Sequence, residues 1–311
     1  MTITSSRVAA ENDASAIAEI VNSHELSVDP ANSVMSVDSA LEFMAGYIDP
    51  SPTHLLTIDG ESDFSAVVNL HPDAVKGRFF ADVYAKPEVK NLTEVTAWAI
   101  DLATAHNSEW AIWPGVNSLD ERLKSAWAAH GFEFLRRYYT MRASTSKAIS
   151  IRSIEDIEIR SIDISDPVIQ THLHHIHQDS FSNHFGFAPR TFEEWHKLLA
   201  KDHLIDRQGV FIAYKGGEAV GFVQCGDDYA DERKGFISTL GVIKVHQGSG
   251  IGEALLQTAM MHCASKGYGV VELNVDTGNE SGALRLYEKL GFKAESSWIQ
   301  MHQIKDGWNA I

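Results

Sequence analysis

Cysteine, basic residues and long apolar runs are all scarce in this sequence. The two cysteines, Cys225 and Cys263, have no CxxC or CxxH partner, which argues against a disulfide scaffold and a metal cage. There are 26 Lys and Arg against 42 Asp and Glu, a net charge of −16, so nucleic acid and anionic membranes are disfavoured as partners. No apolar run approaches a membrane span, and the first residues lack the pattern of a signal peptide. We therefore expect a cytoplasmic protein.

Length and composition fit an ordinary globular protein. The chain has 311 residues, of which 44% are hydrophobic and 22% charged, with only 8 proline and 22 glycine residues. Disordered and collagen-like chains have a different composition, so both classes are excluded. At roughly 100 to 200 residues per domain, the length predicts two domains, each able to bury a core.

A weak internal repeat relates the two halves. Residues 123–141 align with residues 284–301, which places Gly131 opposite Gly291, each followed by phenylalanine. In both copies a glycine suited to a left-handed helix stop is followed by a strand rich in aromatic and branched residues. Each half also has an extended run upstream that leads into a long amphipathic helix. These upstream segments are 79–106 and 236–267.

The repeat predicts two tandem α/β modules. Small and polar residues at about 143–156 suit a linker, so we expect a first domain at 1–145 and a second at 155–311. The second module has the pattern of a mixed sheet covered by helices. Its expected strands are 157–162, 210–214, 219–225, 235–243, 269–275 and 292–303, and its expected helices are 166–180, 191–200, 250–266 and 280–290.

The chemistry concentrates in a glycine-rich loop of the second module. Three glycines at alternate positions follow a strand and open a helix, so backbone N–H groups and the helix dipole are free to hold an anion such as a phosphate. The spacing does not match the GxGxxG loop of dinucleotide-binding folds, and no Gly-Lys-Ser/Thr follows as in a nucleotide-hydrolase loop. The residues are Gln247, Gly248, Ser249, Gly250, Ile251 and Gly252.

Two blocks of the second module resemble the GCN5-related N-acetyltransferase (GNAT) family. Leu240-Gly241-Val242, followed by Gln247-Gly-Ser-Gly-Ile-Gly252, is similar to its L-x-V…[Q/R]-x-x-G-x-[G/A] signature. The segment from Asn279 through Tyr287 to Gly291-Phe292 resembles its N-x-x-A-x-x-L-Y-E-K-x-G-F motif, with one residue more than usual between Asn279 and Tyr287. The resemblance covers residues 157–303 well and residues 1–142 only in outline.

This resemblance implies an acetyl-CoA-dependent N-acetyltransferase that modifies the amine of a small molecule. The backbone N–H of Val242 would stabilise the oxyanion, and the phenol of Tyr287 would protonate the departing thiolate, with no covalent enzyme intermediate. Tandem family members with one active half include an enzyme that acetylates a cysteinyl amine, which stays open as an alternative. The implied acetyl-CoA contacts are Leu240, Gly241, Val242, Gln247, Gly248, Ser249, Gly250, Ile251, Gly252, Asn279 and Tyr287.

The residues expected on the acceptor side lie in one segment of the second module. The family commonly builds its acceptor pocket between the first two helices, so we expect Asn183, His184 and Phe185 to contact the substrate. The general base is left open among several acidic residues and one histidine. These candidates are Asp227, Asp228, Glu272, Asp276 and His184.

A histidine-rich segment offers a second, weaker pattern. His174 to Asp179 satisfies the HHxxxD signature of another acyltransferase class, but it falls on an amphipathic helix rather than a loop. The histidine pairs in this segment have no evident third ligand, so we expect no metal site.

The first half lacks the phosphate loop. At the matching place it has residues 86–95, which contain no glycine, and Trp127 stands opposite Tyr287. We therefore expect a degenerate copy that does not bind the cofactor. An alternative of another class is a catalytically silent acyl-CoA sensor or interaction protein, since a fold alone does not imply activity.

Overall fold

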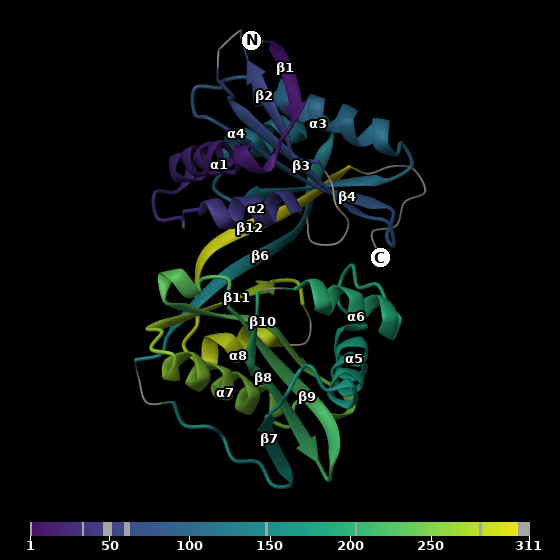
Figure 1. Ribbon diagram of the computed structural model, residues 1–311, viewed down its shortest axis with the longest axis vertical. Helices are drawn as coiled ribbons and strands as arrows, with labels where there is room; N and C mark the ends of the chain where they lie inside the picture. The colour runs from purple at the N-terminus through teal and green to yellow at the C-terminus, as the bar shows by residue number, and fades with distance from the viewer. Residues whose placement is uncertain are drawn as a thin grey trace. The chain divides into compact units, whose positions relative to one another are not determined.

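The computed structural model divides the chain into two compact units (Figure 1). The first contains residues 1–138 and 296–310, and the second contains 139–295. The structure describes residues 2–32, 34–45, 52–58, 63–146, 149–202, 204–279 and 282–303.

The first unit begins with a strand and two helices and continues with three strands before its next helix. An eight-residue helix near its C-terminal end stops before Gly131, whose φ of 80° is left-handed as the sequence predicts. The elements are β1 (Ile3–Val8), α1 (Ala14–Val28), α2 (Val37–Ala45), β2 (His54–Ile58), β3 (Ala66–Asp73), β4 (Arg78–Ala85), α3 (Leu92–His106), β5 (Ala111–Asn117), α4 (Glu121–Ala128) and β6 (Phe132–Ser144).

The second unit repeats this order of elements. Its last helix likewise stops before a left-handed glycine, Gly291, with a φ of 91°. The elements are β7 (Ile157–Ser161), α5 (Pro167–Phe181), α6 (Phe192–Lys201), β8 (Ile205–Lys215), β9 (Glu218–Gly226), β10 (Lys234–Val242), α7 (Ile251–Ser265), β11 (Val270–Asp276), α8 (Ala283–Lys289) and β12 (Lys293–Gln303). The predicted tandem α/β fold is confirmed, although the expected start of α8 at residue 280 lies outside the described residues.

The last strand of each repeat crosses between the units. β6 begins in the first unit and ends in the second, whereas β12 begins in the second and ends in the first. In the strand order of the mixed sheet, β12 lies between β5 and β6, and Trp298 pairs with Asn117. The sequence assigns all of 155–311 to one domain, but this pairing places 296–303 with the first unit. Sequence periodicity predicts the strand and carries no information about its partner.

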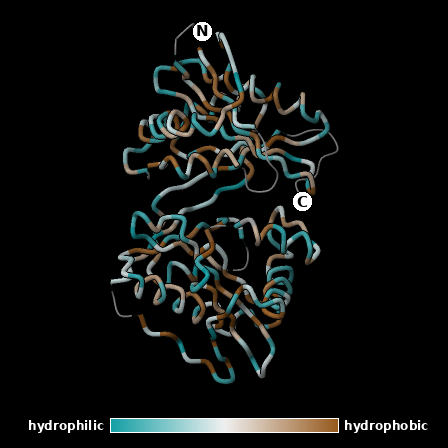
Figure 2. The backbone as a smooth tube through the Cα atoms, viewed as in Figure 1, coloured by the Kyte–Doolittle hydropathy of each residue, from teal (hydrophilic) through white to brown (hydrophobic). Residues whose placement is uncertain are grey.

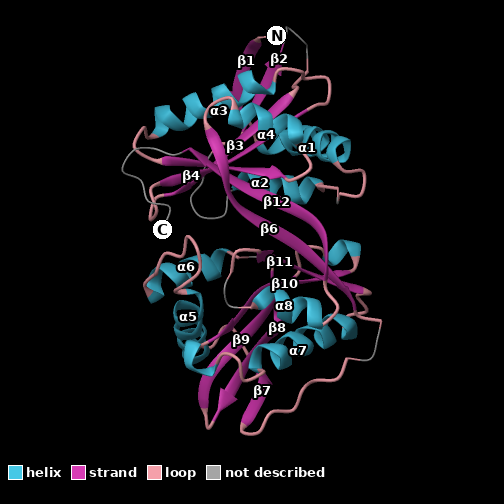
Figure 3. Ribbon diagram, turned by 180° about the vertical axis from the view of Figure 1, so that it is seen from behind, coloured by secondary structure: helices cyan, strands magenta, loops and turns pink. Residues whose placement is uncertain are grey.

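Each unit has its own hydrophobic core. In the second unit, helices cover both faces of the sheet. Figure 2 shows hydrophobic stretches along the strands, and Figure 3 shows the helices that cover them. A Cβ on Gly241 would meet Ser180 of α5, whereas a Cβ on Gly221 would meet Ile251 and Leu255 of α7. Gly221 pairs with Val242, the neighbour of Gly241, and successive residues point to opposite faces. Therefore α5 and α7 lie on opposite faces.

Candidate functional site

In the second unit two parallel strands pair along only part of their length, and we call the region between them beyond the paired stretch the gap. β10 and β11 are paired from Lys234 with Val270 to Ile237 with Leu273, and Leu240 to Val242 lie beyond this stretch. The backbone N–H of Ile243 donates to Val220 of β9. Because antiparallel ladders alternate, the N–H of Val242 points away from β9 and toward the gap. A polar backbone donor is thus directed at the gap.

The strand end itself is fixed by close packing. A Cβ on Gly241 would lie 2.5 Å from the hydroxyl oxygen of Ser180, so only glycine lets α5 approach β10 at this point. Leu240 packs partly buried against the core of the unit. Gly241 and Leu240 therefore both have a role in packing that does not depend on a ligand.

The predicted glycine loop connects this strand to α7 and is exposed to solvent. Gly248 and Gly250 have φ angles of 75° and 92°, which L side chains rarely adopt. Nothing lies within 4 Å of a Cβ built on Gly248. The side chains flanking the loop fold back onto its own backbone, since Gln247 Nε2 donates to Val242 O at 2.9 Å and Ser249 Oγ donates to His246 O at 2.6 Å.

The N-cap of α7 is Gly250, which has no side chain to bond the first N–H groups of the helix, and this fits the binding of a phosphate group. The helix begins at Ile251, which is buried, while Gly252 lies between Val242 and α8. A Cβ on Gly252 would be 3.5 Å from Leu286. The structure thus gathers the whole predicted segment from Leu240 to Gly252 around one strand end and one helix start.

A residue that the sequence analysis assigned to the linker lies over this loop. The guanidinium carbon of Arg152 is 2.9 Å from the place where a Cβ on Gly250 would stand. Arg152 Nη1 also lies 2.9 Å from Glu253 Oε2, and Lys289 Nζ lies 2.7 Å from the other oxygen of Glu253. Lys289, with a smaller contribution from Arg152, lowers the pKa of Glu253. No sequence signal marked Arg152, because its neighbours read as a connecting segment.

The segment after α5 brings the predicted acceptor residues to both sides of the gap. Lys244 Nζ donates to Asn183 Oδ1 at 3.0 Å, just beyond the end of β10. His184 Nε2 lies 3.3 Å from Asn279 Nδ2, just beyond the end of β11. Burial lowers the pKa of His184, although Asp276 opposes this effect. His184 and Asn279, predicted for different ligands, are therefore neighbours, while Phe185 is half-buried beside them.

Tyr287 is a member of the hydrophobic core of the unit. It is 8% exposed, and its ring centroid lies 6.0 Å from that of Phe292. Burial raises its pKa to about 12, so the phenol is protonated throughout the neutral range. The residue can donate a proton or a hydrogen bond but is not ionised beforehand.

Two of the open candidates for the general base are held in ion pairs. Glu272 is 2% exposed and accepts a hydrogen bond of 2.7 Å from Arg142 Nε. Asp227 pairs with Lys266 at 2.7 Å. Of these two, Glu272 is buried, whereas the side chain of Asp227 is 39% exposed. His184 contacts Asn279, and Asp276 is the last residue of β11, so both lie near the gap, while Asp228 stays open as a candidate.

The histidine-rich segment lies on α5, as the sequence predicts. His177 is stacked on Phe181, with ring centroids 4.9 Å apart. Burial, followed by the charge of Arg190, lowers its pKa to about 4. His174 Nε2 lies 2.9 Å from the carbonyl of Arg190. Among the residues that the structure describes, no group of three His, Cys, Asp or Glu side chains is placed to hold a metal ion.

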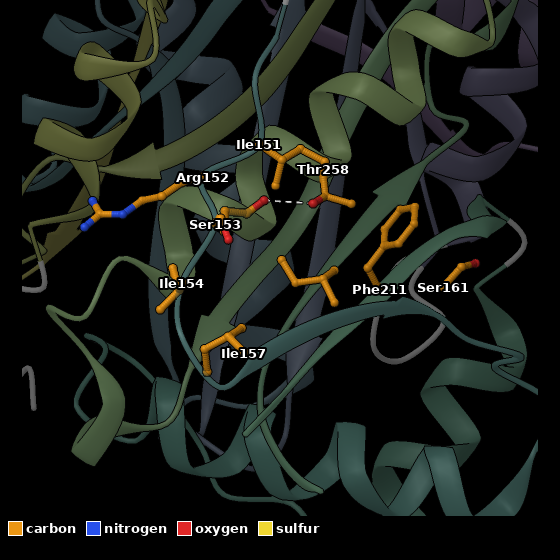
Figure 4. Close-up of a pocket in the computed structure, with 10 residues that line it drawn as sticks. Ile151, Arg152, Ser153, Ile154, Ile157, Ser161, Phe211 and Thr258 are labelled. Carbon is orange, nitrogen blue, oxygen red and sulfur yellow. Dashed lines mark hydrogen bonds between the residues drawn. The ribbon is translucent and has the colours of Figure 1, made fainter. Parts of the chain in front are cut away.

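A cavity of about 370 Å³ lies elsewhere in the second unit, between the segment before β7 and the helix α7 (Figure 4). It contains none of the predicted site residues. Its walls are mostly aliphatic, and Thr258 donates to Ala254 O at 2.8 Å within them. The lining residues are Ile151, Arg152, Ser153, Ile154, Ile157, Ile159, Ser161, Phe211, Ala254 and Thr258.

The corresponding opening in the first unit is filled by polar side chains. β4 and β5 pair from Arg78 to Ala81 of β4, a stretch as long as that between β10 and β11. Beyond it His24 Nε2 lies 2.9 Å from Asp120 Oδ2, and Asn117 donates to Glu25 at 3.1 Å. All four of these side chains are buried.

Comparison with known proteins identifies relatives of part of the chain. The model of the acetyltransferase (GNAT) family matches residues 171–292. Mycothiol acetyltransferase of Streptomyces griseus is 33% identical over 119 residues, which are 38% of this chain and 35% of that protein. The Thermobispora bispora protein of the same name is 34% identical over 117 residues, 36% of this chain and 39% of its own. The matched part therefore spans little more than a third of these relatives.

Solved structures resemble the whole chain in fold. A GCN5-related N-acetyltransferase from Sphaerobacter thermophilus has a TM-score of 0.80 at 19% identity and covers 96% of this chain and 95% of its own. A tandem GNAT protein from the clavulanic acid biosynthesis pathway has a TM-score of 0.70 at 14% identity, with 96% and 97% covered. Within the described residues, no helix is both long and apolar enough to cross a membrane.

Proposed function

We propose that this protein transfers the acetyl group of acetyl-CoA to the amine of a small molecule, because the model of the acetyltransferase (GNAT) family matches residues 171–292. The observation that carries the proposal is the left-handed, exposed glycine loop at the start of α7, beside the gap between β10 and β11. The family supplies the identity of the donor, and the loop supplies a place for its phosphates.

In this proposal the pyrophosphate binds the N–H groups of Gly248 to Gly252 at the positive end of α7. The pantetheine arm runs along the free edge of β10 and is held by backbone hydrogen bonds, as an added strand would be. This route brings the thioester carbonyl to Val242, whose N–H points into the gap and would stabilise the oxyanion. We expect Asn279, Gln247 and Ser249 to border the same path.

The transfer is a direct attack within a ternary complex. The amine nitrogen loses a proton, forms a bond to the carbonyl carbon and expels the thiolate, which takes its proton from Tyr287. The proton removed from the amine restores the phenol through solvent or the base. Cys225 and Cys263 are both buried, so neither is placed to act as an acyl carrier.

The acceptor amine is proposed to enter beside Asn183, His184 and Phe185. His184 is favoured as the group that accepts the amine proton, since burial lowers its pKa and so favours the neutral imidazole, the form that can take up a proton. Its contact with Asn279 fixes the ring beside the gap. Asp276 is the alternative, either directly or through a water molecule.

A more specific candidate is mycothiol synthase-type acetylation of a cysteinyl amine. Its support is the identity of 33% and 34% to two mycothiol acetyltransferases over little more than a third of their length. An alternative of another class is an acyl-CoA sensor without turnover. Retention of Tyr287 together with the complete loop favours an enzyme.

Release of free thiol from acetyl-CoA, measured against a panel of small amines that includes cysteinyl glycosides, tests the proposal. We expect thiol release that depends on one class of amine and is lost in Gly250→Glu. Binding of acetyl-CoA without release for any amine would favour the sensor. Failure of the wild-type protein to bind acetyl-CoA in calorimetry would overturn both.

A further inference from the structure

Arg152 reaches the glycine loop from a part of the chain outside both motif blocks. Its backbone N–H donates to Gln257 Oε1 of α7 at 2.8 Å, which fixes the segment before β7 along the helix. Ile149 and Ile154, on either side of it, pack against the core of the unit. In Figure 4 the side chain of Arg152 points away from the other labelled residues of the cavity. The segment therefore holds Arg152 in place and directs its guanidinium outward.

The guanidinium lies against Gly250 itself. A Cβ at this position would be 2.9 Å from both Cζ and Nε of Arg152, so a side chain on residue 250 and the present position of Arg152 exclude each other. Half of the Arg152 side chain, 49%, is exposed to solvent. A half-exposed cation is thus placed directly against the glycine loop.

The present partner of Arg152 does not depend on it. Glu253 is 11% exposed, and Lys289 Nζ lies 2.7 Å from one of its oxygens and 2.8 Å from the other. If Arg152 turned toward an incoming anion, the carboxylate of Glu253 would stay paired with Lys289. Two cations and one anion leave this cluster with a net positive charge, on a chain whose total is −16.

We propose that Arg152 is a ligand of the pyrophosphate of acetyl-CoA, supplied by the segment that connects the two modules. The inference rests on the proposed function. A planar guanidinium can donate two parallel hydrogen bonds to phosphate oxygens, which complements the single donors of the loop backbone. The same charge offsets the repulsion that Glu253 would otherwise exert on the phosphates. Arg152 thereby makes the connecting segment part of the donor site.

Calorimetric binding of two donors to the full chain tests the proposal. Acetyl-CoA carries the pyrophosphate, and S-acetylpantetheine has the same thioester arm without any phosphate. For Arg152→Ala we expect the Kd of acetyl-CoA to rise about 10- to 100-fold, as for the loss of a charged hydrogen bond, with S-acetylpantetheine unchanged. Arg152→Lys keeps the charge but loses the paired guanidinium donors. Its Kd for acetyl-CoA should therefore lie between those of the wild type and Arg152→Ala.

Arg160→Ala is the matched control, because Arg160 is a similarly exposed arginine of the same unit, 53%, paired with Glu158. It should leave the Kd of both donors unchanged. Acetyl-dephospho-CoA keeps the pyrophosphate but lacks the 3′-phosphate of acetyl-CoA. If Arg152 binds the pyrophosphate, Arg152→Ala should weaken the binding of this analogue as well. An effect that vanishes with this analogue would overturn the assignment to the pyrophosphate.

An unchanged Kd of acetyl-CoA in Arg152→Ala, with wild-type binding intact, would overturn this inference alone. An equal weakening of S-acetylpantetheine would do the same, since it would mean that the loop had shifted. If the wild-type chain binds no acetyl-CoA, the proposed function fails and this inference fails with it. Thermal unfolding of each variant shows whether the fold is retained.

Discussion

Nδ1 of His24 lies 3.0 Å from the carbonyl oxygen of Ala85 and 3.2 Å from its backbone nitrogen in the first unit. Ala85 is the last residue of β4, as Val242 is the last residue of β10. The edge that faces the gap in the second unit is thus occupied by a histidine in the first. Burial alone would lower the pKa of His24, but Asp120 outweighs it and raises the pKa above its ordinary value. This buried pair stands where a thioester arm would have to enter.

We therefore predict that the chain binds one acetyl-CoA. Titration calorimetry on a fully active preparation should give a ratio near one per chain, because displacing the buried His24–Asp120 pair would leave an unpaired charge. In Gly250→Glu the ratio should fall to near zero. A remaining ratio of one in that variant would show a working site in the first unit.

This test needs the full chain. β12 pairs with β5 of the first unit, so a fragment that ends near residue 150 lacks a strand of its own sheet. Such a fragment exposes the edge of β5 and is not expected to fold normally.

The site segment of the second unit could be predicted from sequence because its signals are local. Gly248, Gly250 and Tyr287 belong to short motifs whose residue spacing is specific, and the loop glycines also mark the start of the following helix. Arg152 could not be predicted, because its position depends on packing of Ile149 and Ile154 across the unit. Nor could the exchange of β12, since two similar repeats offer a strand two similar partners.

The internal repeat extends further than its Gly-Phe pair indicates. His24 stands four residues before the last residue of α1, and His177 stands four residues before the last residue of α5. The two helix ends read HELSV and HQDSF. No sequence rule distinguishes the paired His24, whose pKa is raised, from its counterpart His177, whose pKa is lowered, because the carboxylate of Asp120 comes from a distant helix cap.

The glycine loop gives a direct test of the donor site. Gly250→Glu places a carboxylate and a bulky side chain at the loop and displaces Arg152, so the Kd of acetyl-CoA should rise at least about 100-fold, or ~3 kcal/mol. Gly216→Glu is the matched control, since Gly216 also has a positive φ, 57°, with nothing within 4 Å. Calorimetry on both variants decides it. An unchanged Kd in a folded Gly250→Glu would remove the donor assignment.

Tyr287→Phe separates binding from chemistry. The change deletes only the hydroxyl and keeps the ring packing with Phe292, so the Kd of acetyl-CoA should stay the same while kcat falls about 10²- to 10⁴-fold. Tyr214→Phe, at another buried tyrosine of this unit, should leave kcat unchanged. Steady-state kinetics with the best amine measures both. A wild-type kcat in Tyr287→Phe would leave this residue a purely structural role.

The pH profile of kcat should reflect the raised pKa of Tyr287. The proton donor is active in its protonated form, which persists below a pKa of about 12. Ionisation of Tyr287 should therefore cause no loss of kcat up to about pH 10. A basic limb below pH 10 that disappears in the phenylalanine variant would contradict the burial of the phenol.

Acid stability offers a test of the second unit that does not depend on any ligand. His177 has a pKa of about 4 in the folded chain because it is buried, against an ordinary value of 6.5. The unfolded chain thus binds more protons between these values, so stability falls as the pH drops from about 6.5 to 4. At 1.36 kcal/mol per pKa unit, His177 alone should lower the free energy of unfolding by about 3 kcal/mol over this range.

His177→Phe, which keeps a ring beside Phe181, should remove that part of the pH dependence in urea unfolding. His175→Gln, on the exposed side of α5, should leave the profile unchanged. Identical slopes for wild type and His177→Phe between pH 6.5 and 4 would mean that His177 is solvated or paired in the folded chain.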